Sequence, residues 1–358
     1  MAFIAKVFPK IIKIGQKHIG EGNPALIVAD IGANFDGNLK KAKRLAYTAK
    51  ESGADVVKFQ TFKAKTIVSA IGFKSMKLKG VHGSWGKSVD QVFREAEFPL
   101  DWHKQLNDYC KEIGIIFSST PYNFESVDLL IKLDVPFIKI GSGDITWHEM
   151  LKYIAKKNKP MILSTGASTL SEVDEAVRVI ESTGNTRLCL LQCITNYPSK
   201  IKNANINVIN TYKTVYSIIT GYSDHSPGDV VVLGSIALGA KVIEKHFTLN
   251  KLDKGPDHPH SMEPHEFKLM VQRIRDLESG LGSYRKDVVE EESETVIVQR
   301  RSLYANRTLL KGKVIKKKDI IELRPALGIL PKYKELLIDK KVKKTIKKGY
   351  PFKWEDLL

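Results

Sequence analysis

Residues 217–247 read SIITGYSDHSPGDVVVLGSIALGAKVIEKHF, and this stretch contains the unit from which the fold is built. A short run of β-branched and apolar residues is followed by a polar turn and a segment with helical periodicity, after which a second such run begins. From Ala25 onward eight of these runs occur, at residues 26–30, 55–60, 114–119, 136–140, 160–164, 188–193, 217–222 and 241–247. Parallel strands need helical crossovers, and eight strand–helix units can close on themselves. The sequence therefore predicts an α/β fold, a (β/α)8 TIM barrel.

An open, doubly wound sheet is the alternative that the same alternation allows. Such a sheet usually has fewer units and a glycine-rich dinucleotide turn after its first strand, where the pattern Gly-x-Gly-x-x-Gly does not occur in this chain. Amphipathic helices are predicted at residues 39–49 and 266–281, and Thr169 followed by Glu172 predicts a capping box. The barrel is the favoured fold.

The chain changes character after Gly282. Residues 283–294 are polar and acidic without an apolar stripe, whereas the last part of the chain has short strand-like pieces at 302–305, 314–315 and 342–346. We predict a barrel domain over residues 1–282 that begins with a short β extension, a linker over 283–300, and a small β-rich domain over 301–358.

Composition limits the class of protein. The 358-residue chain is 42% hydrophobic and 27% charged and has no persistent heptad or Gly-X-Y period, which excludes disordered, coiled-coil and collagen-like proteins. No apolar run approaches the ~18 residues of a spanning helix, and residues 1–22 lack the apolar region of a signal peptide. The cysteines, Cys110, Cys189 and Cys193, show no Cys-x-x-Cys spacing. We expect a cytoplasmic protein without disulfides and without a membrane partner.

The formal net charge of +17 invites a nucleic-acid interpretation, but its distribution argues against one. Residues 301–358 hold 17 Lys or Arg and 6 Asp or Glu, a net +11, as lysine pairs and triplets that are not interleaved with stacking aromatics. A solvated lysine-rich surface, or a positive field that attracts an anionic small-molecule substrate, explains this charge better. No nucleic-acid partner is predicted.

Functional residues of a TIM barrel gather at the C-terminal ends of its strands, and in this chain those ends are rich in polar residues. They carry Asp30, Asn34, Lys58, Gln60, Ser119, Thr120, Lys139, Ser142, Ser164, Thr165, Thr195, Asn196, Tyr197, Ser223, Asp224, His225, Glu244 and His246. Side chains two residues apart share one face of a strand, so Glu244 and His246 point together while Lys245 points the other way.

Lys58 and Lys139 lie within apolar strands, where a lysine is unfavourable to bury without an anion. Each indicates either a bound negative group or a carboxylate partner such as Asp30 or Glu244 that holds the barrel together. The hydroxyls of Ser142, Ser164 and Ser223 would form a phosphate cradle with the two lysines, although serines at loop starts are also ordinary caps.

His225 and His246 end adjacent strands and could both bind one divalent metal ion through neutral imidazole nitrogens, leaving open positions for substrate oxygen and water. A lone histidine is usually structural. Two histidines at neighbouring strand ends, flanked by Asp224 and Glu244, support a metal site and a structural role equally.

Eight motifs in this order resemble the sialic acid synthase family, the phosphoenolpyruvate-dependent nonulosonate synthases. They are Asp30-Ile-Gly-Ala-Asn34, Val57-Lys58-Phe-Gln60, Ser119-Thr120-Pro121, Ile138-Lys139-Ile-Gly-Ser142-Gly, Leu163-Ser164-Thr165-Gly166, Tyr222-Ser223-Asp224-His225, Ile243-Glu244-Lys-His246-Phe and Gly255-Pro256-Asp257-His258. The C-terminal segment, from Arg301-Ser-Leu-Tyr304 through Arg324-Pro325 to Trp354-Glu-Asp-Leu357, resembles the antifreeze-like SAF domain of that family.

The resemblance implies a transferase that condenses phosphoenolpyruvate with an N-acetylated hexosamine and water, giving a nonulosonic acid and phosphate. It implies phosphoenolpyruvate binding by Lys58, Thr120, Lys139, Ser142, Ser164 and Ser223. It also implies that His225 and His246 bind Mn2+, with Mg2+ or Co2+ as alternatives, and that Asn34, Gln60, Tyr197 and Asp257 line the sugar end. A homodimer with an exchanged SAF domain, which offers Arg324 to the sugar, follows from the same resemblance. The predicted catalytic residues are Asp30, Lys58, Lys139, His225 and His246, and Thr195 and Glu244 complete the predicted substrate site.

Three departures from the family pattern lie near the sugar. Asp30 replaces the usual glutamate, Phe35 replaces the histidine of the familiar Asn-His pair, and the run Arg-Pro-Gly-x-Gly becomes Arg324-Pro-Ala-Leu-Gly328. The Gly255-Pro-Asp257 motif resembles the branch that acts on N-acetylmannosamine, the favoured substrate, or on its 2,4-diacetamido-2,4,6-trideoxy analogue, as in legionaminic acid synthases.

Two further alternatives remain open. One is another phosphoenolpyruvate-dependent 3-deoxy-2-keto acid synthase that uses a sugar phosphate. The other is a basic sugar- or nucleic-acid-binding protein whose barrel has lost activity.

Overall fold

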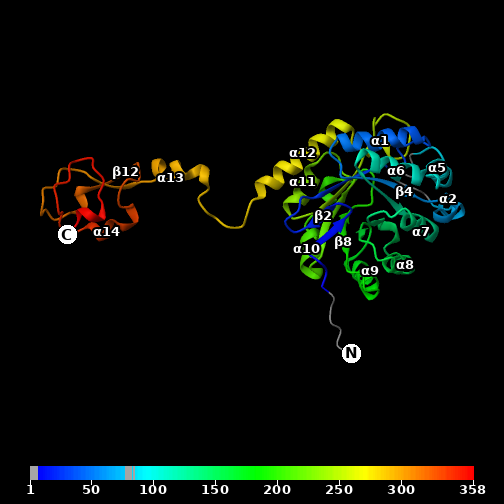
Figure 1. The fold of residues 1–358 in the computed structure, drawn as a ribbon, viewed down its shortest axis with the longest axis horizontal. Helices are drawn as coiled ribbons and strands as arrows, with labels where there is room; N and C mark the ends of the chain where they lie inside the picture. The colour runs from blue at the N-terminus through cyan, green and yellow to red at the C-terminus, as the bar shows by residue number, and fades with distance from the viewer. Residues whose placement is uncertain (1–6, 77–82, 84) are drawn as a thin grey trace, which may run out of the picture. The chain divides into compact units, whose positions relative to one another are not determined.

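The computed structural model describes residues 7–76, 83 and 85–358, which belong to two compact units divided between Gly282 and Ser283 (Figure 1). The predicted TIM barrel is confirmed in the first unit. Eight parallel strands pair in the order β5-β4-β3-β10-β9-β8-β7-β6, and the end strands β5 and β6 lie next to each other, so the sheet is a nearly closed barrel. Its strands are β3 (Leu26–Asp30), β4 (Val56–Thr61), β5 (Ile116–Pro121), β6 (Ile138–Ile140), β7 (Met161–Ser164), β8 (Leu188–Cys193), β9 (Ile219–Asp224) and β10 (Val242–His246).

Three strands, β5, β6 and β9, begin two residues later than the sequence predicts, and for β5 and β9 the cause is the same. Gly114, which ends the helix before β5, and Ser217, which ends the helix before β9, have the left-handed conformation of a helix C-cap, with φ of 76° and 51°. The residues assigned to the strand starts therefore belong to the ends of helices. A shift of two residues keeps the same side chains facing inward.

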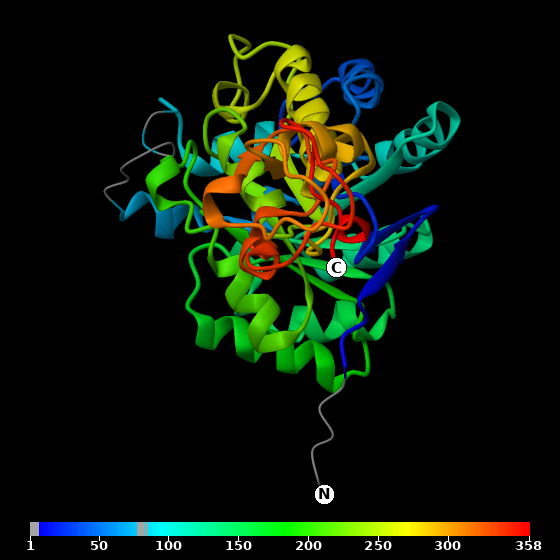
Figure 2. The ribbon, with the colours of Figure 1, turned by 90° about the vertical axis from the view of Figure 1, so that its left-hand side faces the viewer.

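Helices lie around the outside of the barrel strands (Figure 1 and Figure 2). The longer helices bury an apolar stripe, as α1 does with Leu45 and Ala49, and the predicted capping box between Thr169 and Glu172 is present at the start of α9. None of the helices in the described part of the chain is long and apolar enough to cross a membrane. Their bounds are α1 (Leu39–Glu51), α2 (Ala64–Ile67), α3 (Ala70–Lys74), α5 (Val89–Glu95), α6 (Trp102–Ile113), α7 (Phe124–Lys132), α8 (His148–Lys156), α9 (Leu170–Ser182), α10 (Val208–Tyr216), α11 (Val230–Ala237) and α12 (Pro264–Leu281).

Inward-facing side chains change from apolar to polar along each barrel strand. Val28 precedes Asp30 on β3, and Val242 precedes Glu244 on β10, always two residues apart and hence on one face. The apolar members form a buried cluster of Leu26, Val28, Val56, Phe137, Ile162, Cys189, Leu191, Ile219 and Val242. The interior therefore has an apolar floor at the start of the strands and a polar mouth at their ends.

An N-terminal hairpin of β1 (Ile11–Ile14) and β2 (Lys17–Gly20) covers that floor. Ile12, Ile14 and Ile19 are buried in the same cluster as the barrel floor. Because their alternate neighbours are exposed, the hairpin presents one apolar face to the barrel and one polar face to water.

The second unit has its own core around Leu303, Ile320 and Phe352. Strand β11 (Ser302–Ala305) pairs antiparallel with β12 (Ile320–Leu323), and the helices are α13 (Ser293–Gln299) and α14 (Lys334–Leu337). Thus α13 lies within the segment predicted as a linker, and β12 was not predicted. The predicted pieces at 314–315 and 342–346 make single β-bridges instead of strands.

His103 on α6 makes stability depend on pH. It is fully buried, its Nε2 lies 2.6 Å from Thr61 Oγ1, and its Nδ1 lies 3.2 Å from the Pro99 carbonyl oxygen. Burial lowers the pKa of His103 from 6.5 to about 4. The unfolded imidazole takes up a proton near pH 6.5 and the folded one only near pH 4, so stability is lost as the pH falls across this interval.

We expect His103 to account for about 3 kcal/mol of that loss, since a pKa difference of about 2.5 corresponds to this energy. Urea denaturation at pH 7.5 and pH 4.5 should show a smaller loss for His103→Gln than for the wild type. The exposed His265 provides the control, because His265→Gln should keep the wild-type loss. Equal losses in wild type and His103→Gln would contradict the assignment.

Candidate active site

A cavity of about 400 Å³ lies at the C-terminal ends of the barrel strands, and every strand contributes a side chain to it. The inward polar residues that end the strands line it, together with residues of the following loops. Of the predicted site residues, those that line the cavity are Asp30, Lys58, Gln60, Thr120, Lys139, Ser142, Ser164, Thr195, Tyr197, Ser223, His225, Glu244, His246 and Asp257.

Asn34 and Arg324 do not line this cavity. Gly32 has a left-handed φ of 52° and turns the chain away from the cavity after β3, so that Asn34 is fully buried. The Asn34 amide nitrogen donates to the Phe247 carbonyl oxygen and to Ser261 Oγ, both at 2.9 Å. The structure thus corrects the placement of Asn34, which ties the loop after β10 to the loop after β3. Arg324 is exposed on the second unit.

Two lysines and two carboxylates form a buried network in the cavity. Lys58 Nζ lies 2.8 Å from Asp30 Oδ2 and 3.9 Å from Glu244 Oε1, and Lys139 Nζ lies 3.6 Å from the same Glu244 oxygen. Lys139 also donates to Ser164 Oγ at 2.7 Å. Each lysine therefore has a carboxylate partner, which is what a role in holding the barrel together requires. Both lysines also line the cavity, where they can contact a ligand.

The two lysines differ in how well their charge is compensated. Burial lowers the pKa of Lys58, but the charges of Asp30 and Glu244 outweigh it and the pKa is raised above 10.5. For Lys139, burial is again the largest influence, and here it prevails over Glu244, so the pKa is lowered. An anion that enters the cavity would therefore stabilise the charged form of Lys139 more than that of Lys58.

Hydroxyl groups surround the lysines. Thr120 Oγ1 accepts from Lys58 at 3.4 Å, and Ser223 Oγ donates to Glu244 at 3.1 Å. Ser142 Oγ accepts from the backbone N–H of Gly166 at 2.9 Å. Gly166 is needed here, because a Cβ at that position would lie 2.1 Å from Thr195 Oγ1. Hydroxyls and ammonium groups at one end of the cavity are the donors that a phosphate ester requires.

His225 and His246 face each other with ring centroids 5.5 Å apart. His225 Nδ1 lies 2.8 Å from the Ile194 carbonyl oxygen, which can only accept, so Nδ1 carries a proton. Burial lowers the pKa of His225, but Cys193 and the Ile194 carbonyl oxygen outweigh it, so the pKa is raised above 6.5 and Nε2 becomes a metal ligand only on losing its proton. The Tyr197 ring packs beside both, with its centroid 4.2 Å from that of His225 and 5.9 Å from that of His246. A second imidazole nitrogen fixed in this way is typical of metal ligands.

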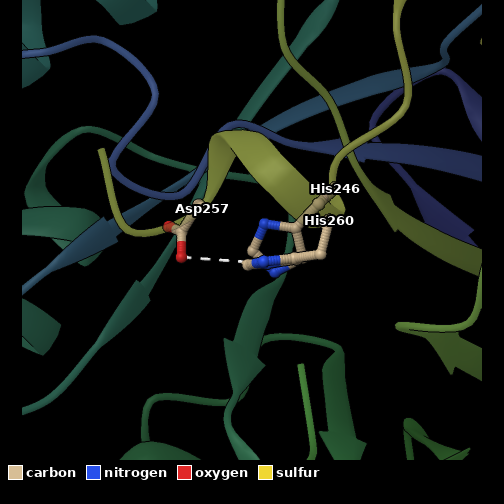
Figure 3. A group of neighbouring side chains, drawn as sticks. All are labelled: His246, Asp257 and His260. Carbon is tan, nitrogen blue, oxygen red and sulfur yellow. Dashed lines mark ion pairs between the residues drawn. The ribbon is translucent and has the colours of Figure 1, made fainter. Parts of the chain in front are cut away.

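His260 is the residue of this site that the sequence analysis missed. His246, Asp257 and His260 each offer a ligand atom, and these atoms lie within 4.8 Å of one another (Figure 3). His260 stands three residues after Asp257, in the short helical segment His258–His260. That spacing, just beyond the Gly255-Pro-Asp257-His258 motif, was the signal that could have found it.

The imidazoles fit a divalent metal ion. Burial lowers the pKa of His246 well below 6.5, with further lowering by His260 and His225, and burial lowers the pKa of His260 to about 4. Both rings are therefore neutral at pH 7, which is the form that binds metals. Among the described residues, His246 Nδ1 and His260 Nε2 have no hydrogen-bond partner although both are buried. Burial also raises the pKa of Asp257 to about 6.

An apolar wall closes one side of the cavity. Phe62, Ile67, Val92 and Phe93 line it, from the segment that follows β4 and from α5. Sequence reasoning missed this wall because its residues are ordinary apolar residues outside the strand ends. Apolar surface beside polar groups is typical of a site for an organic ligand.

Lys245 points away from the cavity, as its place between Glu244 and His246 predicts. Its Nζ lies 2.5 Å from Asp224 Oδ2 and donates to the carbonyl oxygens of Ser226, at 2.5 Å, and Gly228, at 2.9 Å. These bonds hold the turn that follows β9, and that turn carries His225.

Comparisons with known proteins identify chains similar to this one. The NeuB family matches residues 45–286, and the SAF domain matches residues 300–358. The N,N'-diacetyllegionaminic acid synthases of Campylobacter jejuni and Legionella pneumophila are 40% and 38% identical to the chain, over 87% and 96% of it and 94% and 97% of their own length. The crystal structure of N-acetylneuraminic acid synthetase from Leptospira borgpetersenii, in complex with citrate, has a TM-score of 0.71 and 28% identity, covering 81% of this chain and 96% of that one.

Proposed function

The chain belongs to the NeuB family and carries a SAF domain, and from this membership we propose that it condenses phosphoenolpyruvate with an acetamido sugar to form a nonulosonic acid and inorganic phosphate. The resemblance noted in the sequence is thereby confirmed. The observation that carries the proposal is the convergence of two lysines, several hydroxyls and three imidazoles on one cavity at the mouth of the barrel.

Lys58 and Lys139 hold phosphoenolpyruvate together with Thr120, Ser142, Ser164 and Ser223. The charges of the network support this proposal: the nearest carboxylate oxygen lies 2.8 Å from Lys58 Nζ but 3.6 Å from Lys139 Nζ, and burial lowers the pKa of Lys139. A phosphate ester that carries at least two negative charges supplies the negative charge that Lys139 lacks.

Reaction requires that C3 of phosphoenolpyruvate form a bond to the aldehyde carbon of the sugar while the aldehyde oxygen takes up a proton and becomes a hydroxyl. It also requires that water add at C2 with loss of a proton, and that the bond from C2 to the phosphate oxygen break to release phosphate. We assign Asp30 as the group that takes the proton of that water, and its place in the cavity, with Oδ2 3.4 Å from His246 Nε2 and 2.8 Å from Lys58 Nζ, supports this role. Gln60 Nε2, 3.5 Å from the same oxygen, orients the carboxylate. Glu244 contacts both lysines and keeps them in place.

His225 and His246 would hold a divalent ion, with Mn2+ favoured and Mg2+ or Co2+ as alternatives. When bound, such an ion would polarise the aldehyde oxygen of the sugar. The neutral state of His246 and the Nδ1 hydrogen bond that orients His225 support this role.

The sugar itself has two candidates. N-acetylmannosamine is the substrate that the sequence analysis favoured. The apolar wall of Phe62, Ile67, Val92 and Phe93 favours the second, 2,4-diacetamido-2,4,6-trideoxymannose, whose additional methyl groups replace polar surface. The relatives named N,N'-diacetyllegionaminic acid synthases point in the same direction.

A phosphorylated sugar is less well matched. Lys58 and Lys139 are the only lysines or arginines among the described residues that line the cavity, and both are needed for phosphoenolpyruvate. The homodimer, the exchange of SAF domains that would bring Arg324 to the sugar, and the cytoplasmic location stay predictions.

A panel of sugars tests the proposal. We expect the protein, supplied with phosphoenolpyruvate and Mn2+, to release phosphate with N-acetylmannosamine or the diacetamido sugar and to form a nine-carbon acid of matching mass. Erythrose 4-phosphate should give none. Lys139→Met should lose this activity, while the exposed lysine of α8, in Lys156→Met, should keep it. Absence of phosphate release with every acetamido sugar would remove the proposal.

A further inference from the structure

We propose that His260 and Asp257 bind the divalent ion together with His246, so that two imidazoles and a carboxylate from this group hold it. This inference rests on the proposed function for the presence of the ion in this cavity. It concerns a residue, His260, that neither the motifs nor the strand ends of the sequence had indicated.

Proximity is the first observation. The ligand atoms of His246, Asp257 and His260 lie within 4.8 Å of one another, and the rings of His246 and His260 have centroids 4.8 Å apart. Two atoms bound to the same ion at about 2.2 Å can be at most about 4.4 Å apart. Three atoms that share one ion at this distance are on average at most about 3.8 Å apart, so movements of about 1 Å, which side-chain rotations supply, would bring the three ligand atoms together.

Unpaired nitrogens are the second observation, and they are independent of the first. His246 Nδ1 and His260 Nε2 have no hydrogen-bond partner within the described part of the chain, and the two side chains are only 6% and 3% exposed. Leaving a buried polar atom unpaired costs about 1–3 kcal/mol each. Both residues line the cavity, so a ligand that enters the cavity can bind the two unpaired nitrogens and remove this cost.

Asp257 is held in place for such a role. Its Oδ2 accepts from the Ala33 backbone N–H at 2.8 Å, while its Oδ1 lies 3.8 Å from His260 Nε2, too far for a direct hydrogen bond (Figure 3). Gly32 makes room for this arrangement, since a Cβ there would lie 2.3 Å from Asp257 Oδ2 and 3.2 Å from His246 Cε1. One carboxylate oxygen is thus anchored and the other faces the imidazoles.

A second group of acidic and histidine side chains, Asp36, Asp253 and His258, provides a contrast, because its side chains pair with one another and with neighbouring residues. His258 Nε2 lies 3.0 Å from Asp36 Oδ1, and its Nδ1 lies 2.6 Å from Thr248 Oγ1. Lys41 pairs with both carboxylates, at 2.6 Å in the case of Asp253. Both ring nitrogens of His258 have partners and Lys41 compensates the two carboxylates in part, so this group is a structural network.

Mn2+ binding to the full chain tests the assignment, measured by the electron paramagnetic resonance signal of free Mn2+ and by the visible absorption of bound Co2+. We expect His260→Ala and the volume-conserving His260→Gln to weaken Mn2+ binding at least about 10-fold and to change the Co2+ spectrum. The exposed His265, in His265→Ala, is the matched control and should bind both ions as the wild type does.

Wild-type affinity and an unchanged Co2+ spectrum in both His260 variants would overturn the assignment, as would a wild-type chain that binds no Mn2+. Its failure is distinguishable from failure of the proposed function. If the His260 variants lose the ion while the wild type releases no phosphate with any acetamido sugar, the function falls and the ligand assignment stands. If the wild type turns over and the His260 variants bind Mn2+ normally, only the ligand assignment falls.

Discussion

Replacing His246 by alanine is expected to lower the rate of phosphate release more than about 100-fold. Loss of residues that only orient a metal ligand already reduces metal affinity or activity about 10- to 100-fold, and His246 is assigned here as a ligand itself. It also lies 3.4 Å from Asp30, the carboxylate proposed to take the proton of the attacking water. Both parts of the site are therefore affected by one substitution.

The same change should alter the free energy of unfolding of the metal-free protein by only about 1 kcal/mol. His246 lines an existing cavity, so its removal enlarges that cavity without creating a closed void, and its Nδ1 gives up no hydrogen bond to the described residues. Phosphate release and urea denaturation, measured on the same preparation, check both statements. A variant that retains more than a tenth of the wild-type rate would contradict the assigned role.

Lys245 precedes His246 on β10, and its replacement by methionine should mainly affect stability. We expect a loss of about 3–5 kcal/mol in the free energy of unfolding. The side chains of Lys245 and Asp224 are 2% and 0% exposed and form an ion pair, so removing the ammonium group leaves a buried carboxylate and two carbonyl oxygens without their partner. Breaking a buried pair from one side is the costly case, because the remaining charge is uncompensated.

Urea denaturation measures this loss, with Lys268→Met as the control, since Lys268 is exposed on α12 and should change stability by no more than about 0.5 kcal/mol. The double variant Lys245→Met with Asp224→Asn should recover part of the loss, because it removes the stranded charge. If Lys245→Met unfolds at the wild-type urea concentration, the pair does not stabilise the turn after β9.

Regular alternation explains why the barrel could be predicted. A strand side chain faces the same way as the side chain two residues on, so a run such as Val242 to His246 already separates Glu244 and His246 from Lys245. Even the strands that begin two residues late keep that separation, because the shift equals one period. In the second unit β11 was predicted in the same way, whereas β12 was missed.

Loops explain the errors at the site. Asn34 was placed in the cavity because it follows a strand end, but the left-handed Gly32 between them turns it to the Phe247 carbonyl oxygen and Ser261. His260 was missed because it lies beyond the strand end, where no period relates sequence position to direction. The apolar wall after β4 was missed for the same reason.

The chain by itself determined the number of barrel strands, the residues that face their interior, and the change from apolar to polar along each strand, since all three follow from a local two-residue period. Tertiary structure alone decided that Lys139 is less well compensated than Lys58 and that His246, Asp257 and His260 meet. Charge compensation and metal binding depend on distances of a few ångströms between side chains far apart in sequence, and such distances arise only when the barrel closes and the loops pack against its mouth.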